Sequence, residues 1–321
     1  MNEFELIKKY FQKISNNNPG SKKLNDDIFF DKINKLVVSV DTYNERIHFP
    51  NFKYPNLVIK KIIRSSISDL IAKGVKPEYY FISASGNKKQ FTKKNLKIIS
   101  KSLNYEQKKY NYFLLGGDLS KSKNLVISAN FFGFAPKEKI LTREGAKLND
   151  DIYVTGNIGD SFLGLKIIKN NIKINAKLKR YFINQFYCPN IPYKNYKYLY
   201  RFANTSMDIS DGLISDMNKL INKQKLSFEI DLNKIPISKN LQIYLKKYKK
   251  LKKHYMFKGD DYQILFTASQ KKRSLIKSIG KRMNQKFTII GKINNSYKKN
   301  SIKLDNKPLN ISKFKGYSHK F

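Results

Sequence analysis

Cysteine, arginine and acidic residues are scarce in this chain of 321 residues. The single cysteine, Cys188, excludes an intramolecular disulfide framework and any metal site built from several cysteines. Long apolar runs are also missing, since none approaches the roughly 18 residues that a membrane-spanning helix needs. The N-terminus lacks the apolar core of a signal peptide. We therefore expect a soluble, cytoplasmic protein with no membrane partner.

Aspartate and glutamate together number 24 against 64 lysines and arginines, so the formal net charge is +40. Only seven of the basic residues are arginine, whose planar guanidinium is favoured by proteins that read nucleic acids. The lysines recur in pairs over the whole length, whereas a nucleic-acid footprint should form a patch or stripe. We favour a biased surface composition. A basic nucleic-acid-binding protein is the alternative of a different class, and its affinity should remain useful at physiological salt.

Hydrophobic residues make up 40% of the chain, which excludes general disorder, and the length fits about two domains. Apolar runs and turn signals follow one another without a regular βαβ period. A two-domain α+β architecture therefore fits better than a doubly wound sheet. We place an N-terminal domain at 1–136 and a C-terminal domain at 150–321.

Local patterns predict the individual elements. Strands are predicted at 36–40, 79–83, 112–115, 125–134, 152–155, 227–232, 262–267 and 287–290. Helices are predicted at 57–73, 96–103, 161–168 and 272–283. Polar turns should follow the strands at 36–40 and 112–115, and the segment 170–200 should be helical and lie on the surface. An amphipathic helix is predicted at the N-terminus from apolar residues at helical spacing, namely Phe4, Ile7, Phe11 and Ile14.

The few aspartates stand in turn-like settings beside Gly, Ser, Thr or Asn. They are Asp26, Asp27, Asp41, Asp69, Asp118, Asp208, Asp211, Asp260 and Asp261. Carboxylate oxygens of this kind suit hard divalent cations such as Mg²⁺. Any one of them is more simply explained as a helix cap or an Asx turn, but so many caps in so basic a protein is a poor explanation. We expect several of these carboxylates to converge on one cleft and to hold several ions.

Glycine stands next to several of these acids. Gly116 and Gly117 precede Asp118, and Gly212 follows Asp211. Because glycine has no side chain, backbone N–H groups beside it can approach a phosphate closely. Neither a GxxxxGK[ST] loop nor a GxGxxG fingerprint occurs, so phosphoryl transfer would need another scaffold.

Several segments along the whole chain carry a resemblance to a known family. They are NDD at 25–27, SVDT at 39–42 with His48 and Phe49, SISDLIAKG at 66–74, LLGGD at 114–118, LTREGAKLNDDIYVTGNIGDS at 141–161, MDISDGLISD at 207–216, KGDDYQILFT at 258–267 and FKGYSHKF at 314–321. In order and spacing the chain resembles the bacterial thiamine-monophosphate kinases. That family lies within the PurM-like, or aminoimidazole ribonucleotide synthetase-like, ATP-binding superfamily.

The resemblance implies a PurM-like α+β fold, with an N-terminal mixed sheet plus helices and a C-terminal α/β domain. It implies ATP-dependent phosphorylation of thiamine monophosphate to thiamine diphosphate with several Mg²⁺ ions, in homodimers formed through the N-terminal sheets. Direct, metal-assisted transfer requires no protein nucleophile. The alternative within the superfamily is another ATP-dependent enzyme, such as an aminoimidazole- or formylglycinamidine-type synthetase or a hydrogenase-maturation protein.

The resemblance also implies three sets of site residues. The implied Mg²⁺ ligands are Asp27, Ser39, Val40, Asp41, Asp69, Asp118, Asp208 and Asp211. The implied ATP contacts are Gly117, Asp118, Arg143 and Ser210. The implied contacts to thiamine monophosphate are His48, Asp260 or Asp261, and Tyr317.

Five positions depart from the family pattern. Val40 lacks a hydroxyl and could bind metal only through its carbonyl oxygen. Asn25 stands where the family has glycine, and asparagine tolerates a positive φ best among other residues. Ser66 replaces an asparagine, and Lys258 with Asp260 alters a Gly-Gly-Glu-Asp segment, which weakens the substrate assignments more than the metal ones.

The sharpest prediction concerns Asp118 and Asp211, which are far apart in sequence and are expected to meet in one metal–nucleotide cleft. Replacing either with Asn keeps the size and removes the charge, so turnover should fall about 10²- to 10⁴-fold. The melting temperature should rise or stay level, because like-charged carboxylates repel at an empty metal site. Steady-state kinetics and thermal melts measure both effects. An Asp118→Asn protein with wild-type turnover and a lower melting temperature would exclude the metal assignment.

Overall fold

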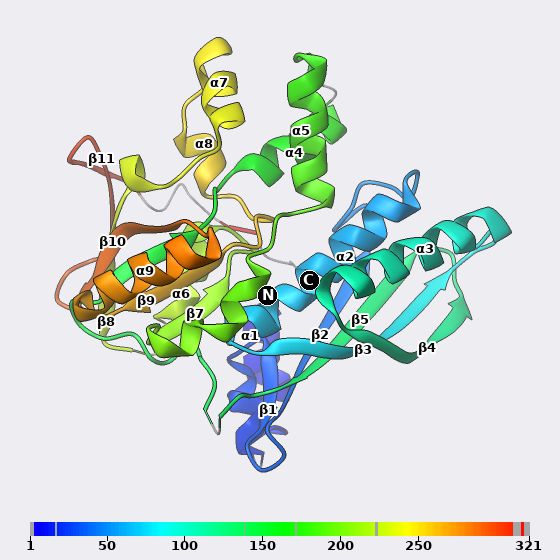
Figure 1. Cartoon of the computed structure of the whole chain (residues 1–321), viewed down its shortest axis with the longest axis horizontal. Helices are drawn as coiled ribbons and strands as arrows, with labels where there is room; N and C mark the ends of the chain where they lie inside the picture. The colour runs from blue at the N-terminus through cyan, green and yellow to red at the C-terminus, as the bar shows by residue number, and fades with distance from the viewer. Residues whose placement is uncertain are drawn as a thin grey trace.

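The structure of the protein is a computed structural model that describes residues 3–16, 18–137, 139–170, 172–221, 224–310 and 316–317. Within these ranges the strands form one five-stranded and one seven-stranded sheet. Figure 1 shows the five-stranded sheet on the right of the view and the seven-stranded sheet on the left, each with its own helices. The mixture of helices and sheets agrees with the α+β class expected from the sequence.

The five-stranded sheet has the order β1-β2-β5-β3-β4, and only its β3–β4 pair is parallel. Its strands are β1 (Ile28–Asp31), β2 (Leu36–Asn44), β3 (Lys76–Gly86), β4 (Phe113–Lys121) and β5 (Val126–Phe134). Two long helices, α2 (Pro55–Ala72) and α3 (Lys93–Tyr110), lie over one face (Figure 1). Side chains of β5 alternate between buried and half-buried, as expected for a sheet covered by helices on one side only.

The seven-stranded sheet has the order β12-β11-β8-β10-β6-β9-β7, and only its β11–β8 pair is parallel. Its strands are β6 (Asp151–Thr155), β7 (Thr205–Asp208), β8 (Leu226–Asp231), β9 (Ile264–Ala268), β10 (Phe287–Asn295), β11 (Ser301–Leu304) and β12 (Lys307–Leu309). Its helices are α4 (Asp160–Asn170), α5 (Ala176–Tyr187), α6 (Leu213–Leu220), α7 (Lys239–Lys247), α8 (Lys253–Met256) and α9 (Arg273–Met283).

A continuous hydrophobic core joins the two sheets. Leu265 and Phe266 are neighbours in β9 and both are fully buried, yet they belong to different cores because successive side chains of a strand point to opposite faces. The core on the Phe266 face also holds Ile62 of α2 and Phe131 of β5. The expected domain division at 136–150 falls in the connection between β5 and β6, and it stays a prediction.

Helix α2 is buried along most of its length because it packs on the five-stranded sheet and also contacts β7 and α5. Its Arg64 makes a forked ion pair with the fully buried Glu106 of α3, at 2.9 Å for each bond, and donates to the Pro189 carbonyl oxygen at 3.2 Å. A second fork joins Arg273 of α9 to Asp151 of β6, at 2.6 and 2.7 Å. Both forks fix elements that lie far apart in sequence.

Two predicted turns are wrong. Strand β2 does not end after Val40 but continues to Asn44. Strand β4 runs through Gly116, Gly117 and Asp118, because this segment pairs with β3 in parallel register. The glycines there indicate a close approach of two strands rather than a turn.

Three smaller expectations also differ. The segment 170–200 contains α5 and two short 3₁₀ turns, but Phe182 and Phe186 are fully buried, so it is not a surface segment. Asn25 has a φ of −110°, outside the left-handed region that would have favoured glycine. The N-terminal helix α1 (Glu3–Leu6) continues into a π-helical turn, and its apolar side chains, such as Phe4, remain exposed.

A search of the helices in the described ranges finds none with the length and apolar character needed to cross a membrane.

Candidate active site

A cavity of about 850 Å³ is lined by residues from both sheets and their loops. The predicted site residues that line it are Asp27, Val40, Asp41, His48, Asp69, Asp208, Ser210, Asp211, Asp260 and Tyr317. These residues come from eight separate stretches of the chain, so the fold brings together most of what the resemblance implied. Both ends of the described chain reach the cavity, because Glu3 and Tyr317 are among its lining residues.

Three carboxylates meet most closely. Asp27 precedes β1, Asp69 lies on α2 and Asp208 ends β7, and one oxygen atom of each lies within 4.8 Å of the others. Hydroxyl groups orient two of them: Ser39 donates to Asp69 at 2.7 Å, and Ser68 donates to Asp208 at 2.5 Å. The resulting donor set is made of oxygen atoms only, which fits Mg²⁺.

The surroundings of these acids favour a positive ion. Burial raises the pKa of Asp208 to about 7, and the charge of Asp27 adds to this. Burial likewise raises the pKa of Asp41 to about 6, and it raises that of Asp69 well above the usual range together with the charge of Asp41. Like charges at close range in a desolvated site are costly unless they are neutralised. A divalent cation would relieve this cost.

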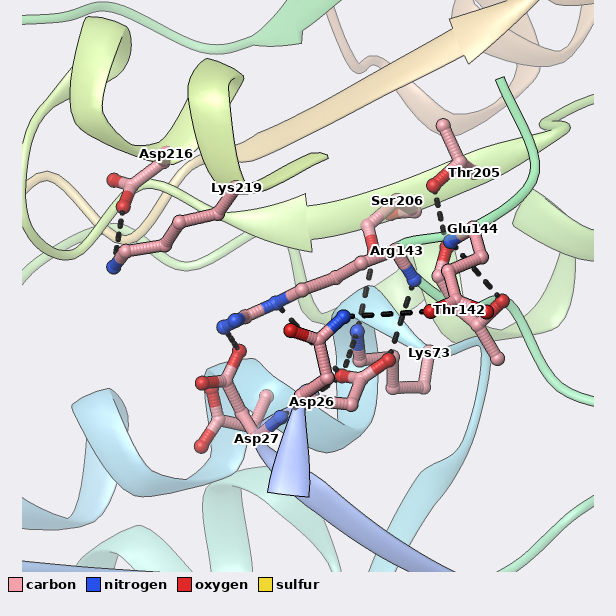
Figure 2. A network of polar contacts seen from close by, with 12 residues as sticks. Asp26, Asp27, Lys73, Thr142, Arg143, Glu144, Thr205, Ser206, Asp216 and Lys219 are labelled. Atoms are coloured by element: carbon pink, nitrogen blue, oxygen red, sulfur yellow. Dashed lines mark hydrogen bonds and ion pairs between the residues drawn. The ribbon is translucent and has the colours of Figure 1, made fainter. Parts of the chain in front are cut away.

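Arg143 neutralises one member of the cluster in Figure 2, where its guanidinium reaches Asp27. Burial opposes ionisation of Asp27, but the charges of Arg143, Lys73 and Lys219 lower the pKa of this carboxyl to about 2. Behind it, Lys73 forms a buried ion pair with Asp26 at 2.5 Å. Arg143 is itself buried and does not line the cavity. Its predicted contact with ATP therefore requires the guanidinium either to leave Asp27 or to contact Asp27 and ATP together.

The SDG segment after β7 forms a compact loop at the start of α6. Asp216 accepts hydrogen bonds from the backbone N–H groups of Asp211 and Gly212, at 3.1 and 3.0 Å. Gly212 has a φ of +120°, and a Cβ atom there would lie 2.4 Å from the carbonyl oxygen of Phe257. The loop therefore needs glycine, and it holds Ser210 and Asp211 at the cavity.

The predicted substrate residues separate into two places. Asp260 lines the main cavity and is paired with the buried Lys61 at 2.6 Å. Asp261 instead lines a cavity of about 110 Å³ and accepts a hydrogen bond from the backbone N–H of Gly159 at 2.9 Å. Of the two alternatives left open by the sequence, Asp260 is the one that faces the main cavity.

His48 and Tyr317 also reach the main cavity. The Nδ1 atom of His48 accepts from the backbone N–H of Asn44 at 2.9 Å, which leaves its ring fixed against Tyr43. The backbone N–H of Tyr317 donates to the Asp211 carbonyl oxygen at 3.0 Å. Of the quoted C-terminal segment 314–321, only Gly316 and Tyr317 belong to the described residues.

Five predicted residues do not line this cavity: Ser39, Gly117, Asp118, Arg143 and Asp261. Ser39 and Arg143 contact acids that do, whereas Gly117 and Asp118 lie in β4. Asp118 is exposed there. Within one chain, therefore, Asp118 and Asp211 do not share the cavity, and a metal-binding role for Asp118 stays a prediction.

Sequence reasoning identified Arg143 but missed the lysines of the site. Lys61, Lys73 and Lys219 each pair with an aspartate in or behind the cavity. Nothing distinguishes these lysines in a chain that contains 64 lysines and arginines. Asp216 lay inside the quoted MDISDGLISD segment, and its position four residues after Gly212 was the available signal.

The fold and the oxygen-lined cavity define the class of the protein, that of the AIR synthase-related, PurM-like proteins. The family model described as "AIR synthase related protein, N-terminal domain" matches residues 25–135. Thiamine-monophosphate kinase of Buchnera aphidicola subsp. Acyrthosiphon pisum is 33% identical, over 99% of this chain and 98% of that protein. This chain belongs to the thiamine-monophosphate kinase family.

Two further comparisons agree. Thiamine-monophosphate kinase of Escherichia coli K12 is 29% identical over 99% of this chain and 98% of that protein. The solved structure described as "AaThiL complexed with AMPPCP and TMP" is similar with a TM-score of 0.84 and 28% identity, and the match covers 99% of this chain and 97% of that one. The PurM-like α+β fold expected from the sequence is confirmed.

The raised pKa values of Asp41 and Asp208 predict how the stability of the metal-free protein depends on pH. A carboxyl whose folded-state pKa is raised stabilises the fold below its unfolded pKa, and this contribution is lost as pH rises through about 6 to 7. In EDTA, thermal melts should therefore show lower stability at pH 8 than at pH 5. Asp208→Asn should reduce that loss by roughly 2 to 4 kcal/mol, whereas equal slopes in both proteins would contradict the assignment.

Proposed function

We propose that this protein transfers the γ-phosphoryl group of ATP to thiamine monophosphate and so forms thiamine diphosphate. The observation that carries the proposal is the convergence of Asp27, Asp69 and Asp208 in one large cavity, in a chain of this family. Charged phosphates must be brought together in this reaction, and a cleft of carboxylates with metal ions supports that task.

We propose several Mg²⁺ ions as the metal component. Asp27, Asp69 and Asp208 would hold one ion. Asp41 and Asp211 line the same cavity and Ser39 donates to Asp69, so these groups would serve further ions. Bound Mg²⁺ would neutralise phosphate charge during transfer. The raised pKa values of the buried acids support this assignment, because these groups lack a neutralising charge in the metal-free protein.

The residues of the chain would divide the remaining work. Ser210 and Arg143 are assigned to the nucleotide, and the Arg143 guanidinium is paired with Asp27. Asp260, His48 and Tyr317 are assigned to thiamine monophosphate, and Asp260 offers a carboxylate to the positively charged thiazolium ring. Tyr262 donates to Asp260 at 3.0 Å and Lys61 donates at 2.6 Å, both to the same oxygen, so the second oxygen can face the substrate.

The reaction itself is the first test. Purified protein should convert thiamine monophosphate to thiamine diphosphate with ATP and Mg²⁺, and product formation should stop in EDTA. Product chromatography with thiamine, thiamine monophosphate and aminoimidazole-type precursors as competing substrates measures this directly. Turnover of a precursor other than thiamine monophosphate would favour another PurM-like ATP-dependent enzyme. Nucleic-acid binding that persists at physiological salt, without kinase turnover, would favour the basic binding protein.

We also propose a cytoplasmic homodimer formed through the uncovered face and edge of the five-stranded sheet. Apolar side chains there are exposed by 38 to 68% of their surface, which is more than an isolated sheet face normally shows to water. They are Val40, Phe81, Phe113, Leu114, Leu115, Leu119 and Phe134. Asp118 lies on the same strand, β4, so pairing would place it at the interface.

Multi-angle light scattering at micromolar concentration should give twice the mass of one chain. Leu119→Lys should reduce the dimer fraction strongly, because a charge would be buried against apolar side chains. Ile33→Lys is the control and should leave the mass unchanged, since this side chain is 91% exposed against 68% for Leu119 and lies outside these strands. A wild-type mass of one chain would contradict the proposal.

A further inference from the structure

Lys219 occupies a position in the cleft that the reaction as proposed does not use. It comes from α6, and its Nζ atom lies 2.5 Å from Asp211 and 3.1 Å from Asp216. Its side chain is 15% exposed and lines the main cavity. Figure 2 shows its side chain extending to Asp216.

The two carboxylates that Lys219 contacts differ in what else they do. Asp216 is fully buried, and its second oxygen holds the backbone of the SDG loop through Asp211 and Gly212. The Asp211 side chain is 27% exposed and faces the cavity. Asp216 is therefore committed to the fold, whereas Asp211 is open to a ligand from the cavity side.

A lysine paired with two acids can release one without becoming an unpaired buried charge. If Asp211 turns to a metal ion, the ammonium group of Lys219 keeps its bond to Asp216, and the ring of Phe4 lies 5.2 Å from it. The metal ion then neutralises the Asp211 carboxylate in place of Lys219. The large desolvation cost of stranding a buried cation does not arise.

We propose that Lys219 is a counterion for Asp211 that Mg²⁺ displaces when the cleft is loaded. In the metal-free protein Lys219 holds the Asp211 carboxylate in place and limits its repulsion with the neighbouring acids. Lys219 thereby sets the Mg²⁺ concentration at which the cleft fills. The proposal rests on the metal role of Asp211 in the proposed function.

Mg²⁺ titrations of the nucleotide-free protein by isothermal calorimetry test this exchange without measuring turnover. Lys219→Met removes the competing charge and keeps much of the side-chain volume, so Mg²⁺ should bind on the order of tenfold more tightly than to wild type. Without metal, the variant should melt at a lower temperature, and added Mg²⁺ should restore it. Lys219→Arg keeps the charge and should stay within about threefold of the wild-type affinity.

A second pair of proteins, in which Asp211 is replaced by Asn, tests whether Lys219 affects Mg²⁺ binding through Asp211 or through its charge alone. In Asp211→Asn the further change Lys219→Met should alter Mg²⁺ affinity less than threefold, because the contested ligand is gone. A tenfold gain that persists there, or no gain in the single variant, overturns the exchange. Absence of Mg²⁺ binding to all five proteins, wild type included, would contradict the metal centre of the proposed function itself.

Chemical labelling of wild type provides a test that needs no variant. Acylation of Lys219 by an N-hydroxysuccinimide ester, read by peptide mass spectrometry, should increase as Mg²⁺ releases its amine from Asp211. Lys169 and Lys258 line the same cavity and form no ion pair with a carboxylate of the described residues, so they serve as internal references. Labelling of Lys219 that stays constant or falls relative to these two lysines would overturn the proposal.

Discussion

Mutual repulsion among clustered carboxylates is the constraint around which this molecule is organised. Asp27, Asp69 and Asp208 bring oxygen atoms within 4.8 Å of one another in a protein that has only 24 acidic residues. Such an arrangement is stable only because hydroxyls and basic side chains contact the acids at fixed positions. Arg143 contacts Asp27, Lys219 contacts Asp211 in the same cavity, and serine hydroxyls orient Asp69 and Asp208. The side chains of the protein therefore neutralise the charge of the cleft only in part.

Helix α2 connects the acidic cluster to the rest of the fold. It carries Asp69 into the cluster, Lys61 to the loop before β9 and Arg64 to α3. Its apolar side chains belong to the core that also covers one face of the seven-stranded sheet. A rigid helix buried on several sides fixes the separation of groups that come from distant segments, which a surface loop would not do. The precision of the cleft therefore depends on packing between the two sheets.

Much of the site could be predicted because its acids lie in short segments with recognisable neighbours. Asp208 and Asp211 share one such segment, and Asp69 follows Ser68 in another. The Gly-Gly-Asp segment was misjudged because glycine pairs resemble turns locally. Only the pairing with β3 explains them, since a Cβ atom on Gly117 would lie 1.7 Å from the Ile82 carbonyl oxygen. Lys61 and Lys73 could not be predicted, because ion pairs between distant segments leave no local pattern, whereas Lys219 lies three residues after its partner Asp216.

The forked ion pairs show where the strong bias of the composition toward lysine has a limit. Arg64 and Arg273 each place two nitrogen atoms on the two oxygens of one carboxylate. A lysine ammonium could supply the charge at either position but not the planar double contact. Replacing arginine with lysine is thus neutral on the solvated surface, whereas at Arg64 or Arg273 it would remove the double contact with the carboxylate. The forked arginines, Arg64 and Arg273, therefore mark two joints at which a lysine would not preserve the geometry of the contact.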